Sequence, residues 1–187
     1  MGSIWNEQVD GALIKLIKRI VKNYDEKGVL EIPSVGVRNP ETDFHITKFP
    51  SVSIHNYDQK QAKDRIQQGD ILSEIDDEGY ALMERPALSY NLYYQIDFWA
   101  NYHDDINEMT RRWLANVEPK TTLEVIDTKD NTRHCNMSLV DYATSDEVVN
   151  GEKLFHRIYS YKIWVELDER DPIRVKVATE GVELGGK

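Results

Sequence analysis

The chain has 187 residues, enough to bury a core of its own, and its 40% hydrophobic and 30% charged residues are typical of globular proteins. Its formal net charge of −10 repels phosphate, which argues against a general nucleic-acid binder. No apolar run approaches the roughly 18 residues that cross a bilayer, and the single cysteine, Cys135, excludes both an internal disulfide and a cysteine-based zinc site within one chain.

The N-terminal segment, residues 6–24, is predicted to be a helix. Its apolar residues recur at steps of three and four and form one stripe, which is typical of a helix packed on a core. The stripe consists of Leu13, Leu16, Ile17, Ile20 and Tyr24. The basic residues of this segment lie mostly off the stripe, so the other side of the helix is expected to be solvated. Residues 28–48 are punctuated by proline and glycine and are interpreted as irregular.

The next two segments differ in pattern. Residues 49–58 place Val52 and Ile54 on one face with a period of two, which predicts a strand. Residues 58–85 are polar and charged, and we interpret them, with an outer limit at residue 88, as a loop or hairpin insertion with weak structure of its own. A polar segment of this length indicates either a function or mobility.

The stretch 86–117 begins with the pattern of a strand and ends with that of a helix. Over residues 90–100 one face is wholly apolar or aromatic, whereas the opposite face mixes polar residues with Tyr93 and Trp99. A solvated face rarely carries two such aromatic residues, so part of it is expected to be covered. Beyond the strand, apolar residues recur at helical spacing, which predicts a helix to the end of the stretch.

The remaining strands complete a sheet. Residues 121–127 and 132–142 flank a turn and predict a hairpin. Residues 157–167 repeat the design of the first long strand, with one apolar face and one mixed face that carries Trp164. We expect the two long strands to lie side by side and antiparallel. The predicted fold class is therefore α+β: a mostly antiparallel sheet of about four to five strands, with the N-terminal helix and the central helix packed on it.

The segment 171–187 is interpreted as an extended C-terminal arm, set apart from a single α+β domain of residues 1–170. Its apolar residues alternate in two pairs, and no partner strand for it is evident within the chain. The pairs are Val175 with Val177 and Val182 with Leu184. Free tails seldom keep such residues in phase, which favours an arm that adds a strand to a neighbouring subunit over a frayed end.

The sequence holds no motif for catalysis, and we predict no enzyme, no cofactor and no metal site. The five histidines lack the spacing of metal ligands, and phosphate-binding glycine loops and nucleophile motifs are missing. Two alternatives from other classes stay open. One is a metal-dependent nuclease that uses Asp97, Glu124 and Lys162 on adjacent strands. The other is a small regulatory module that binds a peptide at exposed aromatic residues.

The order of these elements resembles that of the tail terminator, or tail completion, proteins of tailed bacteriophages, which join head and tail. The resemblance spans about residues 6–167. Its most specific part is the strand YQIDFWA, residues 94–100, which runs directly into a helix. It implies a compact fold with helices packed on a sheet, and it brings no catalytic residue with it.

The resemblance also implies a structural role in the virion. Such proteins form a ring, usually a hexamer, that ends the tail tube and joins it to the neck or connector below the capsid. The implied partners are other copies of the chain, the tail tube protein, the neck protein and, in contractile tails, the sheath protein; no membrane is involved. DNA passes through the lumen without specific binding, which suits an acidic chain. The expected location is the tail or neck region of the virion, after assembly in the host cytoplasm.

Two questions about this role stay open. A different neck or baseplate adaptor protein would look the same in sequence. The interface residues also follow only from the pattern of exposed aromatic and arm residues. The candidates are Tyr93, Trp99, Trp164, Val175, Val177, Val182 and Leu184.

Overall fold

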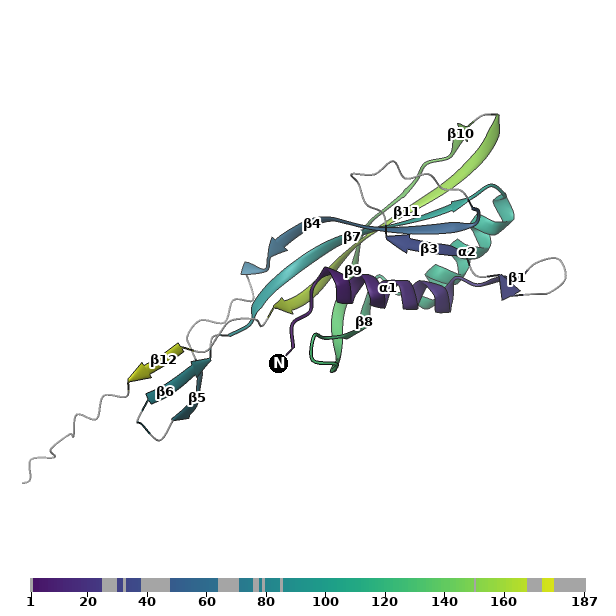
Figure 1. Ribbon diagram of the computed structural model, residues 1–187. Coiled ribbons are helices and arrows are strands. Elements are labelled where there is room, and N and C mark those ends of the chain that lie inside the picture. Colours follow the sequence, from purple (N-terminus) through teal and green to yellow (C-terminus); the bar gives the residue numbers. More distant parts are fainter. Residues whose placement is uncertain are drawn as a thin grey trace, which may run out of the picture.

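The computed structural model describes residues 2–24, 30–31, 33–37, 48–63, 71–75, 78, 80–84, 86–149, 151–167 and 173–176. Two helices and twelve strands lie in this part of the chain (Figure 1). The helices are α1 (Asn6–Ile20) and α2 (His103–Asn116). The strands are β1 (Asn23–Tyr24), β2 (Leu30–Glu31), β3 (Ser34–Val37), β4 (Ser51–Gln61), β5 (Ile71–Ile75), β6 (Tyr80–Glu84), β7 (Leu88–Ala100), β8 (Lys120–Ile126), β9 (Thr132–Thr144), β10 (Glu147–Val149), β11 (Glu152–Leu167) and β12 (Ile173–Lys176).

The main sheet has seven strands, more than the four to five expected. Six of them follow the order β3-β4-β7-β11-β9-β8, and β10 pairs with β11 beside this path. All pairs are antiparallel except β3 with β4, which is parallel. The extra strands β3 and β10 are short segments at the margins of the sheet. They were missed because Pro33 and Gly36 mark the first as irregular and polar residues mark the second as a loop.

The two long strands β7 and β11 form the centre of the sheet, as predicted. They pair antiparallel along their whole length, from Leu88 opposite Leu167 to Ala100 opposite Phe155. Their apolar faces are buried except near one end, where Tyr90 and Leu167 are partly exposed. The buried residues include Leu92, Tyr94, Ile96, Phe98, Tyr159, Tyr161, Ile163 and Val165. The period-two pattern therefore identified both the strands and the face that forms the core.

Both helices pack on this apolar face. From α1, the buried residues are Val9, Ala12, Leu13 and Ile17; from α2, they are Ile106, Met109 and Trp113. At the start of α1 the backbone N–H of Trp5 donates to Oε1 of Gln8 at 3.0 Å, which closes the first turn. The helix ends at Ile20, four residues earlier than predicted, because Asn23 and Tyr24 are extended and pair with β2.

A second, three-stranded sheet stands clear of the main sheet in Figure 1 and has the order β12-β6-β5. Its β5–β6 hairpin lies within the predicted insertion, whose first residues instead extend β4 as far as Gln61. The expectation that the arm has no partner strand in the chain is wrong for residues 173–176, since β12 pairs antiparallel with β6. The partner was hidden because β6 is only five residues long and sits in a charged segment.

Candidate interaction surfaces

The face of β7 and β11 opposite the helices carries a buried polar cluster around Trp99. The indole ring of Trp99 stacks on the ring of His156, with 3.5 Å between centroids and 10° between planes. Its N–H donates to Oγ of Ser53 at 3.3 Å. Trp99, predicted as an interface residue, is thus committed to contacts within its own subunit, and only part of its surface remains exposed.

Asp97 is the centre of this cluster and has no exposed surface. Its Oδ1 lies 2.8 Å from Nε2 of His156 and accepts a hydrogen bond from Nε2 of Gln95, also at 2.8 Å. Oγ of Ser53 donates to its Oδ2 at 3.5 Å. A Ser-His-Asp nucleophile needs the hydroxyl on the imidazole, whereas this hydroxyl is on the carboxylate. The geometry fits a structural cluster that satisfies a buried charge.

Tyr93 and Trp164 form a second group on the same face. Tyr93 lies opposite Lys162 in the pairing of β7 with β11, so Trp164 is its diagonal neighbour. The ring of Tyr93 lies 6.1 Å from that of Tyr57, and Nζ of Lys60 lies 5.1 Å from its centroid. Both predicted interface residues are half-buried, and Tyr57 is 45% exposed. This group is an aromatic surface next to a cation, the composition favoured at protein interfaces.

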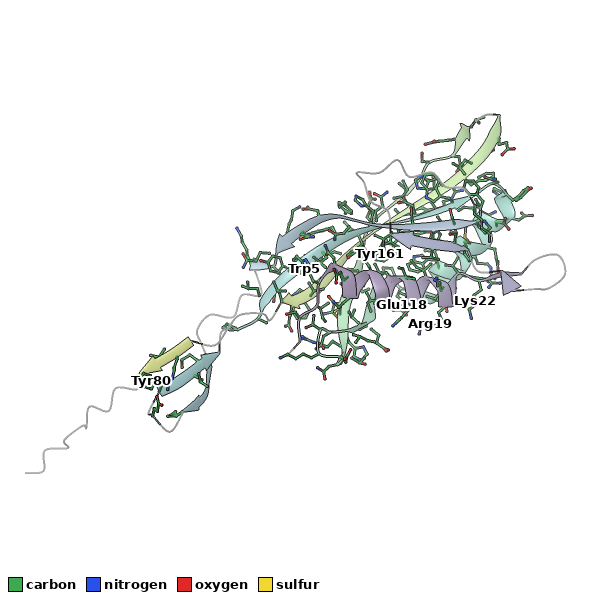
Figure 2. All side chains as sticks on the ribbon, viewed as in Figure 1. Trp5, Arg19, Lys22, Tyr80, Glu118 and Tyr161 are labelled. Carbon is green, nitrogen blue, oxygen red and sulfur yellow. The ribbon has the colours of Figure 1, made fainter. Side chains whose placement is uncertain are left out.

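The C-terminal candidates are only partly visible. Val175 is 47% exposed on β12. Beside it, Nη2 of Arg174 lies 2.7 Å from Oε2 of Glu78, and the guanidinium lies 4.2 Å from the ring centroid of Tyr80. Figure 2 shows Tyr80 on the small sheet, away from the main body. Val177, Val182 and Leu184 lie outside the described residues.

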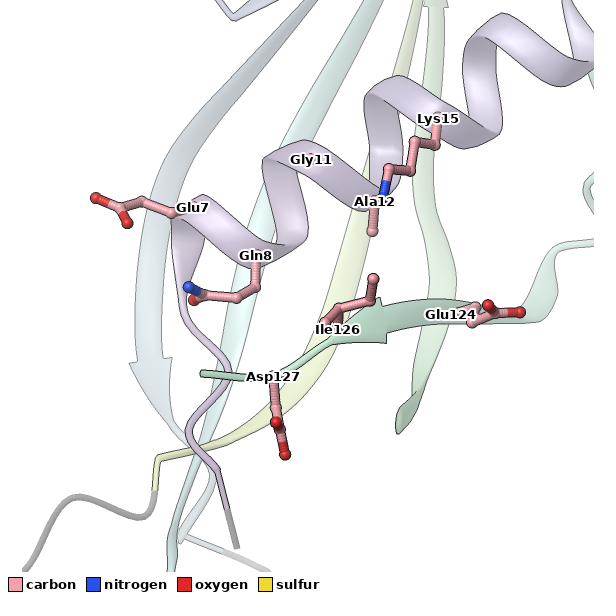
Figure 3. A pocket seen from close by; sticks show the side chains of 8 residues that line it. All are labelled: Glu7, Gln8, Gly11, Ala12, Lys15, Glu124, Ile126 and Asp127. Atoms are coloured by element: carbon pink, nitrogen blue, oxygen red, sulfur yellow. The ribbon is translucent and has the colours of Figure 1, made fainter. Parts of the chain in front are cut away.

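A groove between α1 and β8 was not predicted from the sequence. One hollow of about 330 Å³ lies at the start of α1 (Figure 3) and is lined by Glu7, Gln8, Gly11, Ala12, Lys15, Glu124, Ile126 and Asp127. A second hollow of about 430 Å³ continues along the helix and adds Leu16, Arg19, Thr122, Leu123 and His134. The two hollows share Ala12, Lys15 and Glu124, so they form one groove along the edge of the sheet.

The charges of this groove are separated along its length. At the end near the start of α1 lie Glu7 and Asp127, and at the other end lie Arg19 and His134. Oδ1 of Asp127 accepts hydrogen bonds from the backbone N–H groups of Asn131, at 2.9 Å, and Lys129, at 2.8 Å. These bonds favour the ionised carboxylate and lower the pKa of Asp127, so this end of the groove stays negative.

The three residues of the nuclease alternative do not converge. Lys162 lies opposite Tyr93, four residues along β7 from Asp97, which is about 13 Å of strand. Across β9, Lys162 lies level with Ser138, whereas Glu124 pairs with His134, four residues away in the other direction. Within the described part of the chain, no group of three or more acidic, histidine or cysteine side chains is placed to hold a metal ion. This geometry gives no support to metal-dependent cleavage.

Cys135 offers no nucleophile either. It is buried on β9, and burial raises the pKa of its thiol to about 11. At neutral pH the thiol stays protonated and inert.

Within the described residues, neither helix combines the length and the apolar character needed to cross a membrane.

Comparison with known proteins found similarity at the level of the fold. No family model matches the sequence, and no curated protein matches it. Among solved structures, the fold is similar to the sheath/tube terminator of an extracellular contractile injection system, PVC, seen by cryo-EM in its extended state. The TM-score is 0.54 at 13% sequence identity, and the match covers 100% of this chain and 65% of the other. The chain thus spans less than two thirds of that protein, and the likeness shows a terminator-like fold.

Two features of these surfaces, the polar cluster and the groove, could not be predicted from the sequence patterns alone. The pairing of Asp97 with His156 depends on the register of β7 and β11, which alternation alone does not specify. The groove joins α1 to β8, elements more than a hundred residues apart in the chain. A partial signal was available for the cluster, because both residues lie on the mixed faces of strands expected to be neighbours.

Proposed function

We propose that this protein is a tail terminator: a structural protein of a tailed phage that forms a hexameric ring, ends the tail tube and joins it to the neck. The observation that carries the proposal is the likeness of the whole chain to a sheath/tube terminator. The order of elements over residues 6–167 supports it independently, because that order led to the same class of protein from sequence. The proposed partners are other copies of the chain, the tube protein, the sheath protein and the neck protein.

The surfaces support a role in assembly. The aromatic group at Tyr93 and Trp164 is half-buried on a face without helices. Large apolar side chains are also exposed on the extension of β9 and β10, with Tyr142 45% and Val148 72% exposed. Exposed patches of this kind mark contacts with other proteins. The net charge of −10 suits a ring through which DNA passes without being held.

A tube-capping experiment tests this function. Purified protein is added to polymerising tube protein, and tube length and end structure are followed by electron microscopy, with the mass of the free protein measured by light scattering. We expect ring-shaped oligomers and short tubes capped at one end. Tubes that elongate as they do without the protein would overturn the proposal, whatever its oligomeric state.

Two variants sharpen the assay. Trp164→Ala removes an aromatic side chain from the proposed interface and is expected to weaken capping while the protein stays folded. Leu114→Ala is the control, since Leu114 is 56% exposed on α2 and is no proposed contact. A baseplate adaptor would bind the opposite end of the tail, and a neck adaptor would leave the tube length unchanged. Either result separates this second candidate from a terminator.

A further inference from the structure

The outer edge of β8 is open for strand pairing. Among the described strands, β8 pairs only with β9 and ends the main sheet. The open stretch ends just past β8, where the backbone N–H of Thr128 donates to the carbonyl oxygen of Ser3 at 3.0 Å. An open edge presents a row of unpaired backbone groups, which an extended segment can satisfy by adding a strand.

The groove beside this edge is open next to Gly11. Gly11 and Ala12 are the smallest side chains on this side of α1, and a Cβ built at Gly11 meets nothing within 4 Å. In Figure 3, Ala12 and Ile126 point toward each other across the gap, while Gly11 leaves the helix surface bare. Backbone can therefore approach the helix closely, as an added strand requires.

The chemistry of the groove matches the segment 177–187 of this chain. In an extended conformation Glu180, Val182 and Leu184 share one face of the segment. The deeper half of the groove offers Leu16 and Leu123 as apolar floor. The same hollow carries the cations of Lys15 and Arg19 and the carboxylate of Glu124, so cations outnumber anions there and complement an acidic, apolar strand.

The charges also specify a direction. The segment is acidic at Glu180 and Glu183 and ends with a cation at Lys187. The groove is basic near Arg19 and acidic near Asp127, and β8 runs from the basic end to the acidic end. Opposite charges meet when the segment runs parallel to β8.

We infer that residues 177–187 of a second copy occupy this groove as a strand added parallel to β8. This inference rests on the proposed ring and specifies one of its contacts. The segment follows β12 on the small sheet, which stands away from α1 and β8 in Figure 1. Each copy has one arm and one groove on different surfaces, so the contact is head-to-tail, and a closed ring fills every groove.

Cysteine cross-linking of the full-length chain tests the inference. Chains with Thr122→Cys are mixed with chains with Val182→Cys and oxidised mildly, and the products are separated without reductant. We expect a disulfide-linked pair of chains. Leu114→Cys, at a site 56% exposed on α2, replaces Thr122→Cys as the control and is expected to give no defined product with Val182→Cys. The native Cys135 is buried and does not compete.

Charge reversal provides the second measurement. Lys15→Glu with Arg19→Glu is expected to lower the yield of the cross-link about tenfold, as two weakened charge pairs imply. Glu180→Lys with Glu183→Lys in the partner chain is expected to restore it. Lys18→Glu on the same helix is the matched control, since Lys18 is exposed and does not line the groove.

The outcomes separate this contact from the proposed function. Absence of the disulfide-linked pair overturns the inference, whether the protein is a ring or a monomer. A link formed within one chain carrying both cysteines, at monomer mass, overturns the choice of a second copy. Capped tubes without the cross-link would support the terminator function and overturn this contact. The cross-link without capped tubes would support this contact and overturn the terminator function.

Discussion

The helix-covered face of β7 and β11 buries neutral aromatic side chains, whereas the opposite face buries a carboxylate. On the first, the indole N–H of Trp113 donates to the hydroxyl of Tyr161 at 2.9 Å, and burial raises the pKa of Tyr161 to about 12. On the second, Asp97 depends on His156, Gln95 and Ser53 for its partners. The stability of the protein therefore rests on buried apolar area on the helix-covered face and on the integrity of one polar cluster on the opposite face.

The largest expected effect comes from Trp113→Ala on the helix-covered face. Trp113 is fully buried, and its ring lies 5.6 Å from that of Phe98. Its loss leaves a large cavity and removes a hydrogen bond to the Tyr161 hydroxyl, so the free energy of unfolding is expected to fall by about 5 kcal/mol. Urea denaturation followed by circular dichroism measures this. Trp113→Phe is the milder control, because it keeps most of the ring volume.

The second effect comes from Asp97→Ala on the opposite face. Removing one partner of a buried hydrogen-bonded cluster is expected to cost about 3 kcal/mol, because the polar groups left behind lose their partner. Asp97→Asn keeps the size and part of the hydrogen bonding, so its cost is expected to be smaller. In a double-mutant cycle with His156→Ala, the double variant is expected to lose less than the sum of the two single variants. Simple additivity would show that Asp97 and His156 do not act as a pair.

The smallest effect, with the opposite sign, is expected at Asp10 on α1. Burial raises the pKa of this carboxyl, partly offset by a hydrogen bond to Tyr94. The stability linked to its protonation is complete below its usual value of 3.8 and is lost as pH rises through the higher folded-state pKa. Asp10→Asn is therefore expected to raise the melting temperature at pH 7, with the gain disappearing below that value.

Asp104→Asn is the matched control for this pH experiment. It makes the same change of side chain, but Asp104 is exposed in the first turn of α2, where negative charge favours the helix dipole. Its melting temperature is expected to fall slightly at pH 7. An equal rise in both variants would show that only net charge matters, and the role assigned to the burial of Asp10 would then be wrong.

The fold was predictable where one strand or helix carries a long pattern by itself. The period-two runs of β7 and β11 and the stripe of α1 each extend over ten residues or more, so burial of one face identifies them. The short strands β3 and β10 were missed, because four residues or fewer hold too little pattern to outweigh a nearby proline or charge. For β12 the alternation was recognised, but its partner β6 was not.

The candidate sites were less predictable, because they depend on register and on distant elements. The pattern marked Trp99 as partly covered, yet the covering groups, His156 and Ser53, come from strands on either side of β7. Tyr93 and Trp164 lie on the mixed faces of β7 and β11 and are half-buried, as alternation alone indicates, and their role as interface residues stays a prediction. The groove between α1 and β8 leaves no local signal in either segment.

The pairing of β12 with β6 also has a mechanical consequence. Lys176 lies opposite Tyr80 at one end of this ladder, and Ile173 lies opposite Met83 toward the end from which both strands return to β7 and β11. A pull on the C-terminal segment across this ladder therefore loads one residue pair at a time, beginning with Lys176 and Tyr80. In this way β12 can detach from β6 while the long ladder between β7 and β11 keeps its pairs.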